Sequence, residues 1–408
     1  MLPVFASAQD TQTISGTVSD RQSGKALAFA TVSLKNSATG TICNENGIFD
    51  LIAGGEIKND TLVISYMGYN TQKLAVSSLK LPVAVLLEKS SYFLKEVLVR
   101  PLLPQDYIRM AIRNISENYP GTPFQTLGYY KEQLKENKDF IRDEEAVFKT
   151  YYPNYQASVA NQHQMLLHRK GEVKPLKFMK DKIDKAIEKE NKKAKKNGEE
   201  SDPIDPEEII SSFGGPEAIL GSDFVNEREY FLDSTKFKNY DFSFGPTSTF
   251  LGKEIVVINF ESRRRIDYQN QSGKIFIEPI SYAIVSVEYS SYLEVPGIAD
   301  GALFLLGIGI EDPWISSKYN YYEMDGKWYP QNFRADLSIR VIRKHIFKAN
   351  EVTDFNIQQL FMINKIILDS PSPVEESKRF DAGKKFDGQE FNDDGLKWED
   401  INTIKRTF

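Results

Sequence analysis

The feature that most constrains the fold of this chain is a succession of short strand-like stretches over residues 13–87, separated by turn residues. Side chains alternate between apolar or small and polar in Ile14–Ser19 and again in Val83–Leu87, which is typical of strands with one buried face. Glycine and asparagine, which accept a positive φ at little cost, mark turns at Ser23-Gly24 and Asn44–Gly47. Short strands at this spacing predict a β-sandwich.

A resemblance to a known module supports this prediction. The order of Ile14–Asp20, Ala30–Leu34, Asn44–Phe49 and Ser65–Tyr69 resembles the carboxypeptidase regulatory-like domain, a transthyretin-type sandwich that also precedes the plug of TonB-dependent outer-membrane receptors. The resemblance implies a seven-strand-type β-sandwich over residues 9–90 and an exported protein. It implies no activity.

Two further segments resemble a group of Bacteroidota cell-envelope proteins that carry the same module. One is the pair Asn118–Pro120 and Gly128–Glu132, and the other is Leu396–Ile404 near the end of the sequence. That group is mostly of unknown function, so the second resemblance implies a compartment and no reaction.

Length and composition allow more than one domain and argue against one class of partner. At roughly 100–200 residues per domain, 408 residues are enough for two or three domains. The chain is 41% hydrophobic and 12% aromatic, which is sufficient to fill their cores. The formal net charge of -6 gives no overall attraction to nucleic acid or to an anionic membrane surface. We therefore expect no nucleic-acid partner.

The first residues and the single cysteine bear on localisation. Residues 1–8 are interpreted as the remnant of a signal peptide, because Ala6-Ser7-Ala8 fits a small-residue cleavage pattern after an apolar run. The basic leading region is missing, so an ordinary apolar terminus is the alternative. Cys43 has no partner for an internal disulfide and lies too far along for N-terminal lipidation. We expect a protein of the periplasm or associated with the outer membrane.

A second domain is predicted after a linker at 91–104. Residues 105–368 combine one amphipathic helix between Pro104 and Tyr119 with many strand candidates and no long helix between them. Asp325-Gly326 is a strong two-residue hairpin signal. The fold class is therefore mainly β (α+β), with a large curved antiparallel sheet and a few packed helices. The strand candidates are Leu127–Glu132, Glu145–Thr150, Tyr240–Phe244, Glu254–Glu261, Lys274–Glu278, Ala283–Tyr289, Tyr319–Glu323, Lys327–Gln331 and Ala335–Ile342.

Charged and low-periodicity segments interrupt and follow this domain. A charged insertion is expected near 188–203, where a lysine run precedes acidic residues, and a flexible tail is expected over 369–408 with Leu396–Ile404 as its docking tip. The most apolar run, Gly301–Ile310, is shorter than the roughly 20 residues of a spanning helix, so no transmembrane span is predicted. It is interpreted as a buried strand or loop, or as one wall of an apolar cavity.

Residues that could support catalysis do not form a recognisable motif. The histidines are His163, His168 and His345, and the chain has no His-Glu-x-x-His, Cys-x-x-Cys or Gly-x-Ser-x-Gly pattern. His163 and His168 are predicted to lie in a loop or on an exposed element. Carboxylates such as Glu144-Glu145 and Glu207-Glu208 adjoin only in sequence, and catalysis requires convergence in space. No catalytic residue, metal site or cofactor is predicted.

Asn44–Gly47 also offers oxygen ligands for calcium, but the twelve-residue loop and terminal bidentate Glu of an EF-hand are missing. A turn without a metal is the simpler interpretation.

One segment suggests a function. Gly273–Pro279 followed by Ala283–Tyr289 resembles the hairpin of periplasmic lipoprotein-carrier half-barrels, where a curved sheet encloses acyl chains, although the same alternation describes any one-sided sheet. If the sheet carries such a ligand, the side chains expected to line its cavity are Ile275, Ile277, Val285 and Val287, with Leu303 and Leu305 of the apolar run.

The sequence therefore predicts a non-enzymatic cell-envelope binding or scaffold protein that carries a hydrophobic ligand or contacts an outer-membrane partner. The alternative is a hydrolase, or a peptidase-associated protein, with an unrecognised carboxylate site. The cavities of the second domain separate the two, because an apolar pocket favours carriage and a polar cleft with several converging carboxylates favours chemistry.

Overall fold

A computed structural model gives the fold of most of the chain. The predicted signal remnant at 1–8, most of the linker 91–104, the insertion near 188–203, and Leu303 and Leu305 all lie outside the described residues. The described residues are 11–36, 39–90, 102–155, 160–178, 180, 215–220, 223–228, 230–263, 269–293, 308–345, 348–382, 384, 386–389 and 395–405.

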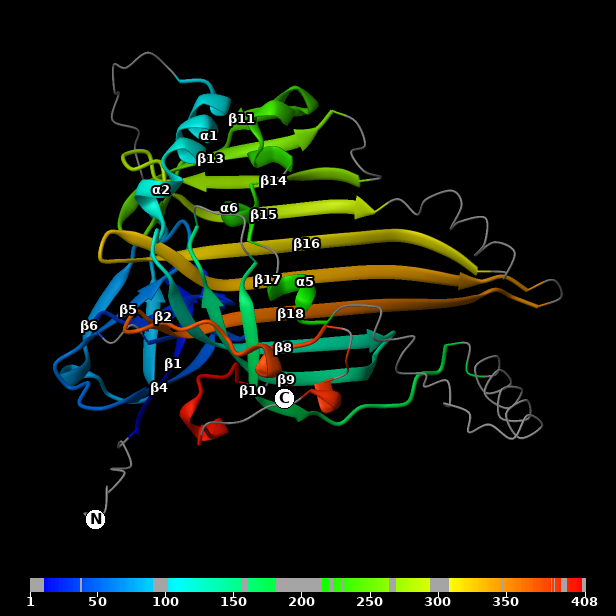
Figure 1. The fold of residues 1–408 in the computed structure, drawn as a ribbon, viewed down its shortest axis with the longest axis horizontal. Coiled ribbons are helices and arrows are strands. Elements are labelled where there is room, and N and C mark those ends of the chain that lie inside the picture. Colours follow the sequence, from blue (N-terminus) through cyan, green and yellow to red (C-terminus); the bar gives the residue numbers. More distant parts are fainter. Residues whose placement is uncertain are drawn as a thin grey trace.

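The N-terminal domain is a sandwich of seven strands in two sheets, as predicted (Figure 1). One sheet has the order β4-β1-β7 and the other β3-β2-β5-β6, and β1 pairs in parallel with β7. The strands are β1 (Thr11–Asp20), β2 (Thr31–Leu34), β3 (Gly40–Ile42), β4 (Ile48–Gly54), β5 (Thr61–Ser65), β6 (Gln72–Ala75) and β7 (Val83–Leu87), with a 3-10 helix η1 (Val76–Ser78).

The sandwich has a core of its own, formed between its two sheets. Phe49 and Val85 are both 1% exposed within it. The predicted turn at Asn44–Gly47 is confirmed, because the Asn44 side-chain oxygen accepts hydrogen bonds from the backbone N–H groups of Asn46 and Ile48 at 3.0 and 2.9 Å. That oxygen therefore serves the turn itself.

The second domain is a single antiparallel sheet of eleven strands, which confirms the predicted fold class. Its order is β10-β9-β8-β18-β17-β16-β15-β14-β13-β11, with β12 paired to β13. The strands are β8 (Phe124–Glu136), β9 (Asp139–Tyr152), β10 (Gln162–Lys170), β11 (Tyr240–Phe244), β12 (Ser248–Phe250), β13 (Lys253–Ser262), β14 (Gln269–Ile277), β15 (Ile284–Leu293), β16 (Ile308–Met324), β17 (Lys327–Arg343) and β18 (Glu351–Ile367).

Three long strands differ from the expectation. β16, β17 and β18 have 17 residues each, so the short candidates at Tyr319–Glu323, Lys327–Gln331 and Ala335–Ile342 are parts of longer strands. β18 was not predicted, yet it lies in the middle of the sheet between β17 and β8. The predicted hairpin at Asp325-Gly326 is confirmed, since both residues have a positive φ and join β16 to β17.

The helices pack on one face of this sheet (Figure 1). The predicted helix is divided at Asn114 into two helices. Its amphipathic character is confirmed, because its apolar side chains Ile108, Ala111, Ile115 and Tyr119 are buried against the sheet. No helix in the described part of the chain is long and apolar enough to cross a membrane. The helices on this face are α1 (Pro104–Arg113), α2 (Ile115–Asn118), α5 (Glu217–Leu220), α6 (Phe224–Glu227), η2 (Tyr230–Leu232) and η3 (Ser234–Asn239).

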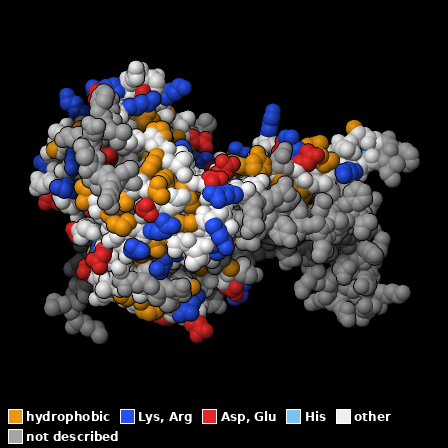
Figure 2. All heavy atoms as spheres, turned by 90° about the horizontal axis from the view of Figure 1, so that it is seen from above, with side chains coloured by type: hydrophobic (Ala, Val, Ile, Leu, Met, Phe, Trp, Pro, Cys, Tyr) orange, Lys and Arg blue, Asp and Glu red, His pale blue; other side chains and the backbone are white. Residues whose placement is uncertain are grey.

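The sandwich packs on the opposite face of the sheet. Ile42 of β3 and Phe29 contact Leu360 and Met362 of β18 in an apolar cluster that Ile401 completes. Figure 2 shows that charged side chains of both signs are interspersed on one face of the molecule. That face therefore carries no extended field of a single sign.

The segment predicted as a docking tip lies between the two domains. Asn402 is 2% exposed, and its side-chain amide donates to and accepts from the backbone of Ile52 in β4. Its own N–H donates to the Asn364 side chain of β18 at 2.6 Å. The remaining short helices follow the sheet in sequence: η4 (Glu376–Lys378), η5 (Phe386–Gly388) and η6 (Trp398–Asp400).

Candidate functional site between the two domains

The residues predicted to line an apolar cavity lie on the helix-covered face of the sheet. Ile275, Ile277, Val285 and Val287 are fully buried and belong to the large apolar cluster between the sheet and the helices. Successive residues of a strand point to opposite faces, so their neighbours along β15 face the sandwich. The cavity described next lies on that second face.

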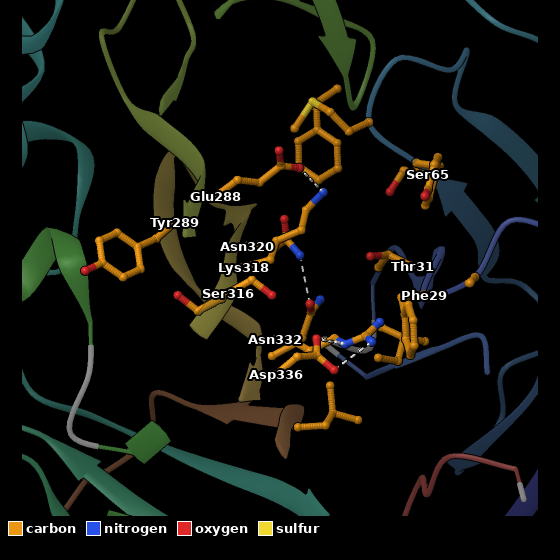
Figure 3. Close-up of a pocket in the computed structure, with 18 of the residues that line it drawn as sticks. Phe29, Thr31, Ser65, Glu288, Tyr289, Ser316, Lys318, Asn320, Asn332 and Asp336 are labelled. Carbon is orange, nitrogen blue, oxygen red and sulfur yellow. Dashed lines mark hydrogen bonds and ion pairs between the residues drawn. The ribbon is translucent and has the colours of Figure 1, made fainter. Parts of the chain in front are cut away.

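A cavity of about 430 Å³ opens between the sandwich and the sheet (Figure 3). Its floor consists of side chains from three neighbouring strands, β15, β16 and β17, and its wall consists of sandwich residues. The floor residues include Glu288, Ser290, Ser316, Lys318, Asn320, Asn332, Arg334 and Asp336, and the wall residues include Phe29, Thr31, Ser65, Tyr66 and Met67.

The charged groups of this floor are paired across and along the strands. The Lys318 ammonium lies 2.8 Å from a carboxylate oxygen of Glu288, which is the residue directly opposite it on β15. Arg334 binds Asp336 through two nitrogens, at 2.9 and 3.1 Å. Each carboxylate of the floor therefore has a cation beside it, and the side chains are held in fixed positions.

Amide and hydroxyl groups lie between these two pairs. The Ser286 hydroxyl donates to the Asn320 side-chain oxygen at 2.8 Å. The Asn320 amide donates to the Asn332 side-chain oxygen, also at 2.8 Å (Figure 3). Asn332 is only 4% exposed, so this chain of hydrogen bonds orients a buried polar group under the cavity.

Phe29 divides the space along the floor. Its ring lies 4.2 Å from the guanidinium carbon of Arg334, a cation–π contact between the two domains. Its φ of 62° is rare for a bulky residue and indicates a conformation imposed by the surrounding contacts. A second cavity of about 300 Å³ also has Phe29, Arg334 and Leu360 in its lining. We call the two cavities together the interdomain groove.

The other face holds a convergence of a carboxylate with tyrosines. Asp223 accepts hydrogen bonds from the hydroxyls of Tyr155 and Tyr321 at 2.7 and 2.6 Å and from the backbone N–H groups of Val225 and Asn226. Burial raises the pKa of Asp223, although these hydrogen bonds act in the opposite direction. Asp223 is 3% exposed and caps α6, so its contacts account for it as a structural group.

The placement predicted for two histidines is wrong. His163 and His168 lie on β10, and neither is exposed. The His168 ring stacks on Phe386 and bonds Glu144 through Nε2, while His163 Nδ1 lies 3.0 Å from the hydroxyl of Thr150. The cause is the segment after β18, which covers β10. No cluster of three or more metal-ligating side chains was found among the described residues.

His163 is expected to make the stability of the protein depend on pH. Burial lowers the pKa of His163 from 6.5 to about 4, so below pH 6.5 the unfolded chain binds a proton that the folded chain does not. We expect the free energy of unfolding to fall by about 2 kcal/mol between pH 7 and pH 5 through this group. Urea denaturation at both pH values checks this, and His163→Gln should flatten the slope. An unchanged slope in that variant would contradict the prediction.

The structure defines a two-domain β protein with a polar groove where the sandwich meets the sheet. Residues 14–99 match the family model of the CarboxypepD_reg-like domain, so the N-terminal domain is of that type. None of the curated proteins matches the chain.

Three solved structures show low similarity to the chain. A DUF1329 family protein from Desulfovibrio piger is 8% identical, with a TM-score of 0.26 over 66% of this chain and 94% of that one. A structure of lipovitellin, described for its lipid–protein interactions, is 8% identical, with a TM-score of 0.25 over 63% of this chain and 26% of that one. A putative membrane-associated protein of unknown function from Bacteroides fragilis is 10% identical, with a TM-score of 0.16 over 88% and 99%. At these scores the likenesses carry no argument about function.

Proposed function

We propose that this is a non-enzymatic binding protein of the cell envelope whose ligand occupies the interdomain groove. The observation that carries the proposal is the floor of the first cavity, where ion pairs and hydrogen bonds hold polar side chains of three strands in place. Concave sites with a few fixed polar groups are typical of ligand binding. The type of the N-terminal domain and the Ala6-Ser7-Ala8 pattern support the envelope location.

The geometry supports binding better than hydrolysis. Both carboxylate oxygens of Asp336 bind Arg334, and one carboxylate oxygen of Glu288 binds Lys318. A general acid or a nucleophile needs a carboxyl group directed at the substrate with its oxygen available. Asp223, a further carboxylate with converging partners, is buried and bonded to protein groups.

The geometry also favours a polar ligand over an acyl chain. The four predicted apolar lining residues of β14 and β15 are fully buried in the core on the other face. The floor of the groove offers hydroxyls, amides and ion pairs, and apolar side chains such as Phe29, Met67 and Leu360 also line it. A polar ligand recovers hydrogen bonds there that an acyl chain leaves unmade.

The test places a tryptophan at one position inside the groove and, as a control, at a matched position outside it. Ser316 lines the first cavity, whereas Ser338, a partly buried serine of β17, lines neither cavity of the groove. We expect a ligand from a panel of peptides, oligosaccharides and fatty acids to raise the melting temperature of the wild type and of Ser338→Trp, and not of Ser316→Trp. Circular dichroism confirms folding of each variant. A ligand that stabilises all three proteins equally would contradict the proposal.

A further inference from the structure

The second cavity extends the groove across the sheet. Residues of β18, β8 and β9 line it, and these strands continue the sheet from β17 in the order β18-β8-β9. Neighbouring strands lie about 4.8 Å apart, so six strands give a groove of about 24 Å across the sheet. A ligand that fills both cavities is therefore an extended chain of linked units.

The floor offers side chains and no free backbone. Six strands form the floor, in the spatial order β15-β16-β17-β18-β8-β9, and each is hydrogen-bonded to a strand on both sides. An added peptide strand therefore finds no unpaired edge there. Recognition depends on groups such as Ser316, Asn320 and Gln133, which line the two cavities. Hydroxyl and amide side chains both donate and accept hydrogen bonds, as the ring hydroxyls of a sugar chain do.

The cations of the second cavity differ in their partners. Lys131 lies 3.5 Å from Glu145, Lys405 lies 2.9 Å from Asp50, and Arg334 is bound by Asp336. The Lys135 ammonium lies 4.6 Å from the centre of the Phe140 ring, and within the described ranges it pairs with no carboxylate. Glu45 and Asp143 line the same cavity, so its cations outnumber its carboxylates by four to two. A partly buried cation that pairs with no carboxylate favours a ligand that supplies the negative charge.

We infer that the ligand is an acidic oligosaccharide, an inference that rests on the proposed function. Its hydroxylated rings lie over Ser316, Asn320 and Asn332 in the first cavity. A carboxylate of the chain binds Lys135 in the second cavity. The chain passes Phe29, which lines both cavities.

The experiment separates the charge of the sugar chain from its hydroxyls. Titration calorimetry compares three acidic tetrasaccharides, one of galacturonate, one that contains glucuronate and one from alginate, with their methyl esters. The esters keep the sugar rings and lose the charge. We expect Lys135→Met to weaken binding of the best acid about tenfold, equivalent to about 1.4 kcal/mol, and to leave its ester unchanged. The matched control is Lys138→Met, a lysine of the exposed β8–β9 turn that lines neither cavity. It should bind as the wild type does.

A second variant tests the first cavity. Asn320→Leu should weaken the acid and the ester alike, because it removes a hydrogen-bonding group and no net charge. The inference is overturned if no uronate binds, if the ester binds as tightly as the acid, if Lys135→Met changes nothing, or if tetraglutamate binds more tightly than every uronate. In each of these cases the proposed function still stands if Ser316→Trp removes the binding of some other polar ligand. The proposed function is wrong only if Ser316→Trp still binds every ligand that the wild type binds.

Discussion

Glu132→Ala is expected to lower the free energy of unfolding by about 3–5 kcal/mol, because it removes a fully buried carboxylate that binds a guanidinium and three hydrogen-bond donors. Glu132 is 0% exposed, and one of its oxygens lies 2.6 Å from the Arg142 guanidinium. The other oxygen accepts hydrogen bonds from Tyr130, Gln359 and the backbone N–H of Gly215. Those donors lose their acceptor as well, which adds to the cost. Urea denaturation at pH 7, followed by circular dichroism, measures the change.

Two comparisons make this result specific. Glu88 forms an ion pair with Arg21 in which both side chains are more than half exposed, so Glu88→Ala should cost less than about 1 kcal/mol. Replacing both partners, with Glu132→Leu and Arg142→Met together, should recover much of the stability lost in the single variant. A loss below 1 kcal/mol for Glu132→Ala would show that the network is not formed in solution.

Phe49→Ala is the second large expected effect, a loss of about 3–5 kcal/mol in the stability of the sandwich. Phe49 is 1% exposed, and its ring packs against Gly16, where a methyl group would come within 2.8 Å of it. Removing the ring leaves a cavity that a β-sandwich closes only in part. Differential scanning calorimetry should show a clearly lower melting temperature. A wild-type value would mean that the pairing of Gly16 with Phe49 between β1 and β4 is wrong.

Local signals explain what the sequence predicted well. Strands β1, β4 and β7 of the sandwich alternate with a period of two, and glycine stands at its turn positions 24, 47, 55 and 68, where φ is positive. Asp325-Gly326 specifies a tight hairpin for the same reason. These patterns depend only on neighbouring residues, so one sequence is enough to detect them.

β18 was missed because its pattern changes along its length. Phe355 and Ile357 alternate with polar residues, but the run from Leu360 to Ile363 is continuously apolar. The cause is burial on both faces: Phe361 and Ile363 pack toward the helices, while Leu360 and Met362 pack toward the sandwich. A strand covered on both faces loses the period-two signal.

Only one part of the candidate site could be predicted from the sequence. Val285 and Val287 identify the buried face of β15, and the same alternation places Glu288 on the other face. The pairing of Glu288 with Lys318, however, depends on the register between β15 and β16. The position of Phe29 above Arg334 depends on how the sandwich packs on the sheet. Neither follows from residue spacing within one segment.

The central place of β18 has a consequence for how the chain assembles. The strands β8 to β10 precede α5 in sequence, and β11 to β17 follow η3, so each group can pair internally before residues 351–367 leave the ribosome. Until then β8 and β17 each present an open edge, which is a template for strands of other molecules. Closure then requires contacts between distant residues such as Tyr130 and Phe361, and such contacts form slowly. A chain interrupted before residue 351 therefore keeps unpaired edges on β8 and β17, and it lacks the strand β18 that joins them.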